Sequence, residues 1–198
     1  MRLAQHRTDM TVSKKRAFAD ERGFSLPEIL TIVALIGLLF GITIIAFQAA
    51  AVTIQGDSNL RIVEGQLKFA RDVAVSQRRT VQVVLVAPNV IQVIRQDRPA
   101  GTTLLSSAVL ENNTTFVDFD DVGDTPETFG ADSVYAPGAL STLMFTADSM
   151  FTDSSGSPAN ATIFIGQTGK RTTARAVTVF GTTARIRTYR WNGSQWGH

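Results

Sequence analysis

The sequence predicts an α+β protein in which a long N-terminal transmembrane helix packs on a C-terminal antiparallel sheet domain. Residues 29–47 are 19 consecutive positions without a charge, close to the roughly 20 apolar residues that a membrane-spanning helix needs. Residues 60–79 then repeat apolar side chains at helical spacing. From residue 80 onward the chain consists of short β-branched runs separated by Gly, Pro and Asn. Helices followed by a series of strands are typical of the α+β class.

The composition limits the chemistry that the protein can perform. The 198 residues are 44% hydrophobic and 18% charged, which suits one globular domain with an accessory segment. There is no cysteine, so disulfides, thiolate metal sites and cysteine nucleophiles are excluded. The two histidines are His6 and His198, which nearly excludes a triad with a buried histidine. We therefore predict that the protein has no catalytic residue and is not an enzyme.

The charge around the apolar run predicts its orientation in a membrane. Residues 1–23 carry six basic and three acidic side chains, whereas the rest of the chain carries 13 basic and 14 acidic ones. A basic N-terminal flank favours a cytoplasmic N-terminus with the remainder on the other side. The apolar run is too long for a signal peptide. A helix over residues 24–55 measures about 48 Å against a hydrocarbon core of about 30 Å, so we expect it to span the membrane to about residue 47.

The first turn of this helix contains Pro27 and Glu28. Proline is tolerated there because its missing N–H has no intrahelical partner. Glu28 meets the positive end of the helix dipole, a gain of about 0.3–1 kcal/mol. That gain is smaller than the roughly 2.5–3.5 kcal/mol that a carboxylate costs at the centre of a membrane. The sequence therefore predicts a specific partner for Glu28.

Residues 23–28, Gly-Phe-Ser-Leu-Pro-Glu, follow a basic leader and precede the apolar helix, and this pattern resembles the type III signal of type IV pilins and type II secretion pseudopilins. The resemblance implies that prepilin peptidase removes the leader, residues 1–23, by cleaving between Gly23 and Phe24, and that Phe24 is then N-methylated. It also implies that Glu28, fifth in the mature chain, neutralises the α-amine of a neighbouring subunit's Phe24 as helices bundle in a filament. The alternative is an ordinary single-pass anchor with Glu28 at the membrane interface.

The remaining residues, 56–198, are expected to form an α+β head. Cap candidates at residues 56–59 predict the start of a second helix, whose buried stripe contains Leu60, Val63, Leu67, Ala70 and Ala74. Pro88-Asn89 predicts a hairpin between residues 80–87 and 90–95. Further strands are expected at residues 108–110, 115–119, 143–146, 161–165, 175–180 and 184–191. A last type I′ turn at Asn192-Gly193 would place Tyr189 opposite Trp196.

The order of a helix, a hairpin and a late basic strand resembles the GspH/FimT group of minor pseudopilins and pilins. In that group the late strand often carries Gly-Arg-x-Arg, and residues 184–187 here read Ala-Arg-Ile-Arg. Side chains two apart share one face of a strand, so Arg185, Arg187, Tyr189 and Trp191 are expected to point one way. Guanidinium groups beside aromatic rings suit a nucleic-acid backbone with stacked bases. With Arg190, these side chains are the candidate DNA contacts, because some pilins of the group bind DNA for uptake in natural transformation.

The acidic residues of the chain support a second explanation of the same strand. Residues 102–169 carry nine acidic and no basic side chains, and residues 170–198 carry six basic and no acidic ones. The arginines are therefore also expected to pair with the acidic loop at Asp118, Asp120 and Asp121. Asp118, Asp120 and Asp124 are oxygen ligands that suit calcium, but the EF-hand spacing is absent and a solvated turn is favoured. We predict no metal and no cofactor.

Together these observations predict a minor pilin or pseudopilin, a structural subunit that primes or caps a type II secretion pseudopilus or a type IV pilus. The alternative is a DNA-binding minor pilin. The precursor would be a single-pass inner-membrane protein with a cytoplasmic N-terminus, and the mature head would be periplasmic or extracellular. Its partners would be other pilin subunits through the N-terminal helix, prepilin peptidase and the inner membrane, with DNA or a secreted cargo as a further partner.

Overall fold

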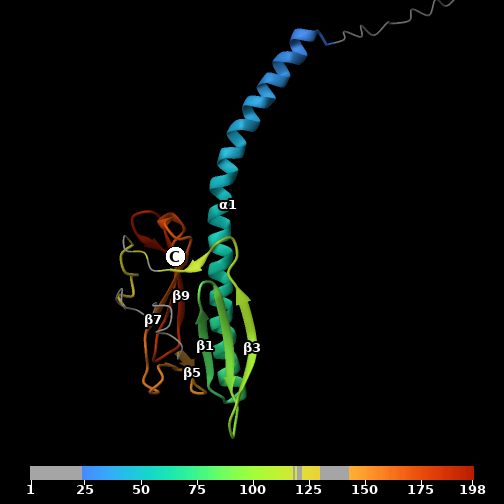
Figure 1. Ribbon diagram of the computed structural model, residues 1–198. Helices are drawn as coiled ribbons and strands as arrows, with labels where there is room; N and C mark the ends of the chain where they lie inside the picture. Colours follow the sequence, from blue (N-terminus) through green and yellow to red (C-terminus); the bar gives the residue numbers. More distant parts are fainter. Residues whose placement is uncertain (1–23, 118, 120–121, 130–142) are drawn as a thin grey trace, which may run out of the picture. The chain divides into compact units, whose positions relative to one another are not determined.

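We describe the protein from a computed structural model that covers residues 24–117, 119, 122–129 and 143–198. The chain divides into two compact units, one ending at Ile44 and the other formed by Ile45–His198. Each unit is described by itself. Figure 1 gives the labels of the helix and strands that are used below.

The first unit is an exposed apolar helix. This unit contains the first part of helix α1 (Leu26–Gln77), and the rest of α1 belongs to the second unit. The helix starts after Ser25, whose carbonyl oxygen accepts hydrogen bonds from the N–H groups of Glu28 and Ile29 at 3.0 and 3.2 Å. Its segment Leu26–Ile44 has 19 residues, a mean hydropathy of 2.2 and no buried share. By length and composition this segment can cross a membrane.

The helix continues without a break through residues 56–59, so the predicted start of a second helix there is wrong. The polar residues that suggested a cap are used in tertiary contacts instead. Asn59 is only 1% exposed; its side-chain nitrogen donates to Thr114 Oγ1 at 2.8 Å, and its oxygen accepts from the Glu111 N–H at 2.9 Å. Asp57 forms an ion pair with an arginine of the sheet. Because these side chains bind residues far along the chain, none of them is needed to end or begin a helix.

Two antiparallel sheets form the rest of the second unit. The first has the strand order β3-β2-β1-β5-β6 and the second β10-β9-β8-β7-β4. The strands of the first sheet are β1 (Val81–Val86), β2 (Val90–Gln96), β3 (Thr102–Val109), β5 (Leu143–Phe145) and β6 (Phe151–Thr152). Those of the second are β4 (Thr115–Phe116), β7 (Ala161–Gly166), β8 (Arg175–Val179), β9 (Ile186–Trp191) and β10 (Trp196–Gly197), with a short 3₁₀ turn, η1 (Arg171–Thr173), before β8.

Most of the predicted strands are confirmed, although their lengths differ. The predicted hairpin is β1 and β2, which pair in register from Val81 with Arg95 to Val86 with Val90. The strand expected at residues 108–110 is the end of the longer β3, which pairs with β2 along its whole length. That pairing could not be read from the polar composition of β3. The predicted α+β class, with a helix packed on antiparallel sheets, is confirmed.

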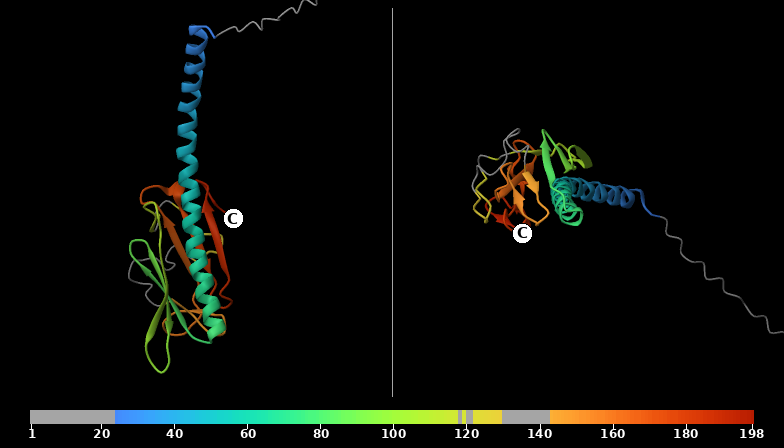
Figure 2. Two further views of the ribbon diagram at one scale, coloured as in Figure 1. Left: turned by 90° about the vertical axis from the view of Figure 1, so that its right-hand side faces the viewer. Right: turned by 90° about the horizontal axis from the view of Figure 1, so that it is seen from below.

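The main hydrophobic core lies between α1 and both sheets. The left-hand view of Figure 2 shows the helical part of this unit running along the strands. The predicted stripe of Leu60, Val63, Leu67, Ala70 and Ala74 is buried, with at most 4% exposure. Burial of each of the larger aliphatic side chains contributes about 1.5–3 kcal/mol. Because every residue of this core lies after residue 59, the second unit has a hydrophobic core of its own.

A second, smaller core covers the other face of the second sheet. It contains Phe119, Phe164, Ala174, Ala176, Tyr189 and Trp196. All residues of β7 and β8 are buried, because alternate side chains enter the two cores. Ile163 and Ile165 belong to the main core, for example, while Phe164 between them belongs to the second.

The turn between β9 and β10 differs from the predicted two-residue turn at Asn192-Gly193. Trp196 pairs with Trp191, so Tyr189 does not lie opposite Trp196. The Asn192 side-chain oxygen accepts hydrogen bonds from the backbone N–H groups two and three residues later, at 2.9 and 2.8 Å. This side-chain turn lengthens the loop and shifts the register of the hairpin.

Candidate functional site

The predicted processing and assembly residues lie at the start of α1. Phe24 is 71% exposed and precedes the helix, and Glu28 is exposed in its first turn. Gly23, the residue before the predicted cleavage position, lies outside the described residues. The structure thus gives Phe24 an accessible position and places the Glu28 carboxylate one turn further along the chain.

The helix that follows Glu28 offers only apolar surface. The sequence has no charged side chain between Glu28 and Asp57, and the large apolar side chains of the Leu26–Ile44 segment are all more than 40% exposed. The hydroxyls of Thr31 and Thr43 donate to the carbonyls of Glu28 and Leu39, both at 2.8 Å. The helix therefore satisfies these polar groups internally, as hydrocarbon surroundings require.

The basic strand β9 is held by one buried carboxylate. Glu127, whose side chain is 9% exposed, accepts hydrogen bonds on Oε1 from Arg187 Nη1 and from the Tyr189 hydroxyl, both at 2.7 Å. Arg185 Nη2 lies 3.9 Å from Oε2 of the same carboxylate. Three of the predicted DNA contacts thus share one face, as expected, and all three are directed at Glu127.

This arrangement decides between the two roles predicted for the arginines of this strand, which are DNA binding and pairing with acidic side chains. The arginines Arg185 and Arg187 pair with an acidic side chain, that of Glu127. The predicted partners Asp118, Asp120 and Asp121 lie outside the described residues. Tyr189 is 1% exposed and belongs to the second core, so its ring offers no surface for a stacked base. The structure therefore does not support the DNA-binding alternative.

The segment of residues 122–129, which we call the acidic loop, is fastened to the second sheet at both ends. At one end Trp196 Nε1 donates to the Gly123 carbonyl oxygen at 2.6 Å. At the other end, beside Glu127, the rings of Phe129 and Phe180 meet edge to face at 4.8 Å. The Arg185 guanidinium lies 4.2 Å from the centre of the Phe180 ring, a cation–π contact. These contacts hold the loop over the second core.

The environment of Tyr189 also changes its proton affinity. Burial raises the pKa of the Tyr189 hydroxyl above its usual value of about 10, since the charged phenolate is poorly solvated there. The hydrogen bond to the Glu127 carboxylate raises this pKa further, because the protonated hydroxyl is the donor. Tyr189 therefore stays protonated and acts as a structural donor.

The last predicted DNA contact, Arg190, lies on the opposite face of β9 and has a different partner. Arg190 pairs in register with Arg175 of β8, and both reach the same oxygen of Asp57 on α1. The Nε–Oδ1 distances are 2.9 Å for Arg175 and 3.1 Å for Arg190. Sequence reasoning missed both Asp57 and Glu127. The separation of acidic and basic segments along the chain was a signal for a partner such as Glu127, but Asp57 lies outside the acidic segment and had no such signal.

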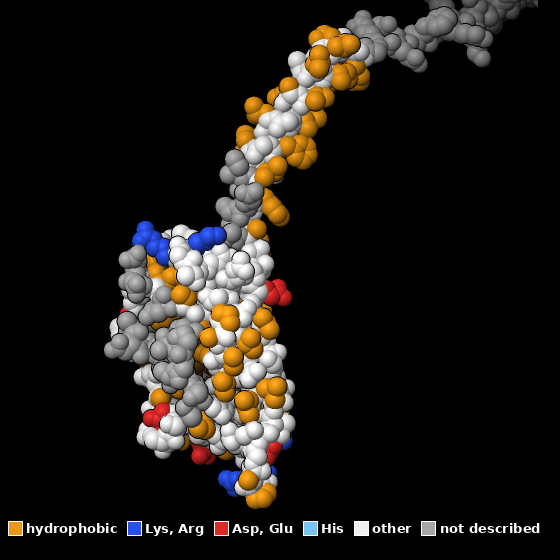
Figure 3. Space-filling view, viewed as in Figure 1, with side chains coloured by type: hydrophobic (Ala, Val, Ile, Leu, Met, Phe, Trp, Pro, Cys, Tyr) orange, Lys and Arg blue, Asp and Glu red, His pale blue; other side chains and the backbone are white. Residues whose placement is uncertain are grey.

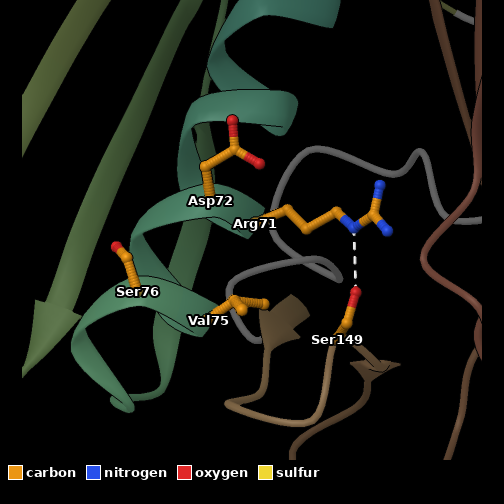
Figure 4. Close-up of a pocket in the computed structure, with 5 residues that line it drawn as sticks. All are labelled: Arg71, Asp72, Val75, Ser76 and Ser149. Atoms are coloured by element: carbon orange, nitrogen blue, oxygen red, sulfur yellow. Dashed lines mark hydrogen bonds between the residues drawn. The ribbon is translucent and has the colours of Figure 1, made fainter.

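A shallow groove beside α1 is lined by Arg71, Asp72, Val75, Ser76 and Ser149. Figure 4 shows the Arg71 side chain reaching from the helix to the turn between β5 and β6, where its Nε donates to Ser149 Oγ at 2.9 Å. The groove therefore contains a polar link between helix and first sheet. Within the described parts of the chain there is also no group of three His, Cys, Asp or Glu side chains that could hold a metal ion.

Comparisons with known proteins give structural neighbours. No protein-family model matches the chain, and no curated protein matches it. The chain is similar to the minor pseudopilin EpsH of the Vibrio cholerae type II secretion system, with 14% identity over 74% of this chain and 98% of that one and a TM-score of 0.47. It is also similar to the Pseudomonas aeruginosa type IV minor pilin FimU, with 17% identity over 76% of this chain and 96% of that one and a TM-score of 0.45.

Proposed function

We propose that the protein is a minor pilin or pseudopilin, a structural subunit of a type II secretion pseudopilus or a type IV pilus. The observation that carries the proposal is the unburied apolar helix, Leu26–Ile44, whose one charged side chain is Glu28 in the first turn. Such a surface needs hydrocarbon before assembly and neighbouring helices after it. This role requires packing surfaces and no catalytic group.

The processing steps belong to the same proposal. Prepilin peptidase removes the leader between Gly23 and Phe24, and the amine of Phe24 becomes N-methylated. The precursor is held in the inner membrane with its N-terminus in the cytoplasm, so that the head is periplasmic or extracellular. In the filament, Glu28 pairs with the α-amine of a neighbouring subunit and sets the register of the helices. That pairing supplies the partner that a carboxylate needs in apolar surroundings.

The test is to express the chain with a prepilin peptidase and the other subunits of a filament system, and to analyse the sheared filaments. We expect the wild-type chain in the filament fraction, with a mass that begins at a methylated Phe24. We expect Glu28→Ala to be cleaved and to remain in the membrane fraction, because its helix lacks the charge that fixes the register.

Two controls make this test specific. Thr31→Ala removes a hydroxyl that bonds only within the helix, so this variant is expected to assemble normally. The head of Glu28→Ala must unfold at the wild-type temperature, since Glu28 lies outside both cores. Normal incorporation of Glu28→Ala into filaments contradicts the register role, and an uncleaved wild-type chain contradicts the proposed family of functions.

A further inference from the structure

Strand β3 is an open edge of the first sheet within the residues that the structure describes. It pairs with β2 on one side, and the strand order β3-β2-β1-β5-β6 places it at the end of the sheet. It has eight residues, whereas the other edge strands of the two sheets, β4, β6 and β10, have two each. An edge strand exposes N–H and C=O groups with which a further strand can pair. Among these edges, β3 is therefore the one that is long enough to accept a strand.

The sequence of β3 does little to protect this edge. Proteins often protect a long edge with charged side chains or proline, and the residues of β3, Thr-Thr-Leu-Leu-Ser-Ser-Ala-Val, include neither. The register shifts between Val93 and Ile94 of β2, where Leu105 is an extra residue of β3, and such a bulge bends a strand. Leu105 packs on the main core, while Leu104 and Ser107 on either side of it remain exposed. The edge is therefore bent at one point and open on both sides of it.

The outer face of β1, β2 and β3, which points away from the main core, carries no charged side chain. The one charged residue of these strands, Arg95, pairs in register with the buried Val81, and its Nη1 donates to Gln77 Oε1 at the end of α1. Leu104 and Val109 of β3 are each 55% exposed. Figure 3 shows hydrophobic side chains over the part of the second unit where Figure 1 draws β1 and β3. The apolar side chains on this face are Val84, Val86, Val90, Ile94, Leu104 and Val109.

Opposite charges lie just beyond the two ends of β3. Arg98 precedes the strand and Glu111 follows it, and both are exposed without an ion-pair partner among the described residues. The neighbouring Asp97 is already paired with Arg95 at 2.7 Å. All strand pairs of the first sheet are antiparallel, and an antiparallel partner runs from the Glu111 end of β3 to the Arg98 end. The charges therefore favour a strand that is preceded by a basic residue and followed by an acidic one.

We propose that β3 accepts an antiparallel strand from the head of a different subunit of the same filament. The accepted strand is uncharged where it pairs, has apolar side chains at alternate positions, and has a basic residue before it and an acidic residue after it. Its main chain pairs with the edge of β3, and its outward side chains extend the uncharged outer face. The proposal rests on the assembly with other subunits in the proposed function, and it names the surface through which the heads meet.

A second copy of this chain fits the same charges but not the direction of assembly. Its own β3 lies between Arg98 and Glu111, in the order that the edge favours. The helical part of the head runs along the strands, as the left-hand view of Figure 2 shows, so antiparallel pairing of two β3 strands reverses the helix of the second copy. The proposed contact between Glu28 and a neighbouring Phe24 needs subunits that run in the same direction. A different subunit is therefore the partner.

The test places a photo-cross-linking amino acid at Thr102 in one variant of the full chain and at Val109 in another. Both positions lie on the outer face, at the two ends of β3. Each variant is assembled with the prepilin peptidase and the other subunits, and the irradiated, sheared filaments are analysed by mass spectrometry. We expect both variants to cross-link to one strand of another subunit, at sites about six residues apart and in reversed order, because the side chains of directly opposite residues are about 5 Å apart. The same amino acid at the exposed Ser154, between β6 and β7, should not cross-link to that strand.

Matched variants assign the contact to the edge and to its two charges. Ser107→Lys places a charge on the uncharged face and should abolish the cross-links, whereas Ser154→Lys adds the same charge to an exposed loop and should leave them unchanged. Arg98→Gln and Glu111→Gln should each lower the ratio of cross-linked to free chain by up to about fivefold. Arg78→Gln, at an exposed arginine just after α1, is the control for the loss of a charge. The heads of all these variants should unfold at the wild-type temperature, so that a lost cross-link is not a lost fold.

The possible results separate this inference from the function on which it rests. A wild-type chain that is not cleaved, or is absent from the filaments, contradicts the proposed function. A chain that enters the filaments without cross-links from Thr102 and Val109, or with unchanged cross-links in Ser107→Lys, overturns strand addition alone. Cross-links between two copies of this chain show that the partner is a second copy and that the assignment to a different subunit is wrong. Sites scattered over several elements of the partner contradict pairing with one strand.

Discussion

At the scale of single residues, two carboxylates organise the charges of the second sheet. On one face of this sheet Asp57 binds Arg175 of β8 and Arg190 of β9, and on the other face Glu127 binds Arg187 and Tyr189 of β9. Both carboxylates are at least four-fifths buried. Removing one partner of such a buried ion pair lowers the free energy of unfolding, because the other charge is left buried without compensation. Asp57 therefore connects the start of the head's sequence to its C-terminal strands, and Glu127 connects a central loop to the same strands.

Tyr189 gives this region a predictable response to alkali. Since its pKa is raised in the folded protein, its contribution to stability is complete below about pH 10 and is lost as the pH rises through the folded-state pKa. Tyr189→Phe should remove that loss. It should also lower the free energy of unfolding at pH 7 by about 1–3 kcal/mol, because Glu127 loses a donor.

The measurement is urea unfolding of residues 55–198 at pH 7 and at several values above pH 10. The matched control is Tyr135→Phe, which removes the other tyrosine of the chain. Wild-type and Tyr135→Phe proteins should lose stability in parallel above pH 10, and Tyr189→Phe should lose less. An equal alkaline loss in all three proteins contradicts the assignment to Tyr189.

Residue-scale partners were the hardest feature to predict from the sequence. The separation of acidic and basic segments correctly indicated pairs between the loop and β9. It did not select Glu127, which is 60 residues before Arg187 and three residues after Asp124, in a loop whose path depends on the second core. Asp57 was assigned to a helix cap because capping is local and a contact 118 residues away is not visible in a sequence.

At the scale of elements, close packing between two loops determines which residue the turn between β8 and β9 can contain. Gly181 follows β8 in the turn that leads to β9, and a Cβ atom there would lie 2.6 Å from the backbone nitrogen of Ala159. Its N–H donates to the Asn160 side chain at 2.9 Å, and its carbonyl accepts from the Phe151 N–H at 2.8 Å. The turn residue is therefore glycine because another backbone passes directly beside it.

We expect Gly181→Ala to destabilise the head by about 1–3 kcal/mol, since the methyl group can be accommodated only by moving a backbone segment. Gly197→Ala is the matched control, because a Cβ at that position meets nothing within 4 Å. Thermal or urea unfolding of both variants decides the point. If the two glycine variants are equally stable, the loop at Ala159 moves freely and the close approach is unimportant.

Element-scale features that depend on local pattern were predicted well. Helical spacing identified the buried stripe of α1, and Pro88-Asn89 identified the turn between β1 and β2. The two wrong predictions, a second helix start and a two-residue last turn, are at asparagines whose side chains form hydrogen bonds that local pattern does not show. Asn59 keeps α1 continuous by bonding outside the helix, and Asn192 lengthens the last turn by accepting two N–H groups.

At the scale of the whole molecule, the second unit contains all that its folding requires. Both cores consist of residues from Leu60 onward. A fragment of residues 55–198 should therefore be soluble and unfold in one cooperative transition. A fragment of residues 68–198 lacks Leu60, Val63 and Leu67 from the main core and should not fold, since each lost side chain costs about 1.5–3 kcal/mol. Circular dichroism and urea unfolding of the two fragments provide the comparison, and a non-cooperative longer fragment contradicts the independence of the unit.

The fold class was predictable because two different periods of hydrophobicity occupy different parts of the chain. Helical spacing before residue 80 and strand-like runs after it lead to an α+β protein whatever the details of pairing. The division of the strands between two sheets was not predictable. It depends on β5 pairing with β1 across more than fifty residues, and on a second core that only the folded chain brings together.

The long neutral stretch of the helix has one more consequence. Residues 29–56 contain no charge, and as helix they measure about 42 Å, which is about 12 Å more than a typical hydrocarbon core. Lipid bilayers of different thickness can therefore be matched by sliding or tilting the helix, without carrying Glu28 or Asp57 into hydrocarbon. In the proposed membrane-anchored precursor, the helix would tolerate hydrophobic mismatch because its charges are further apart than a hydrocarbon core of about 30 Å requires.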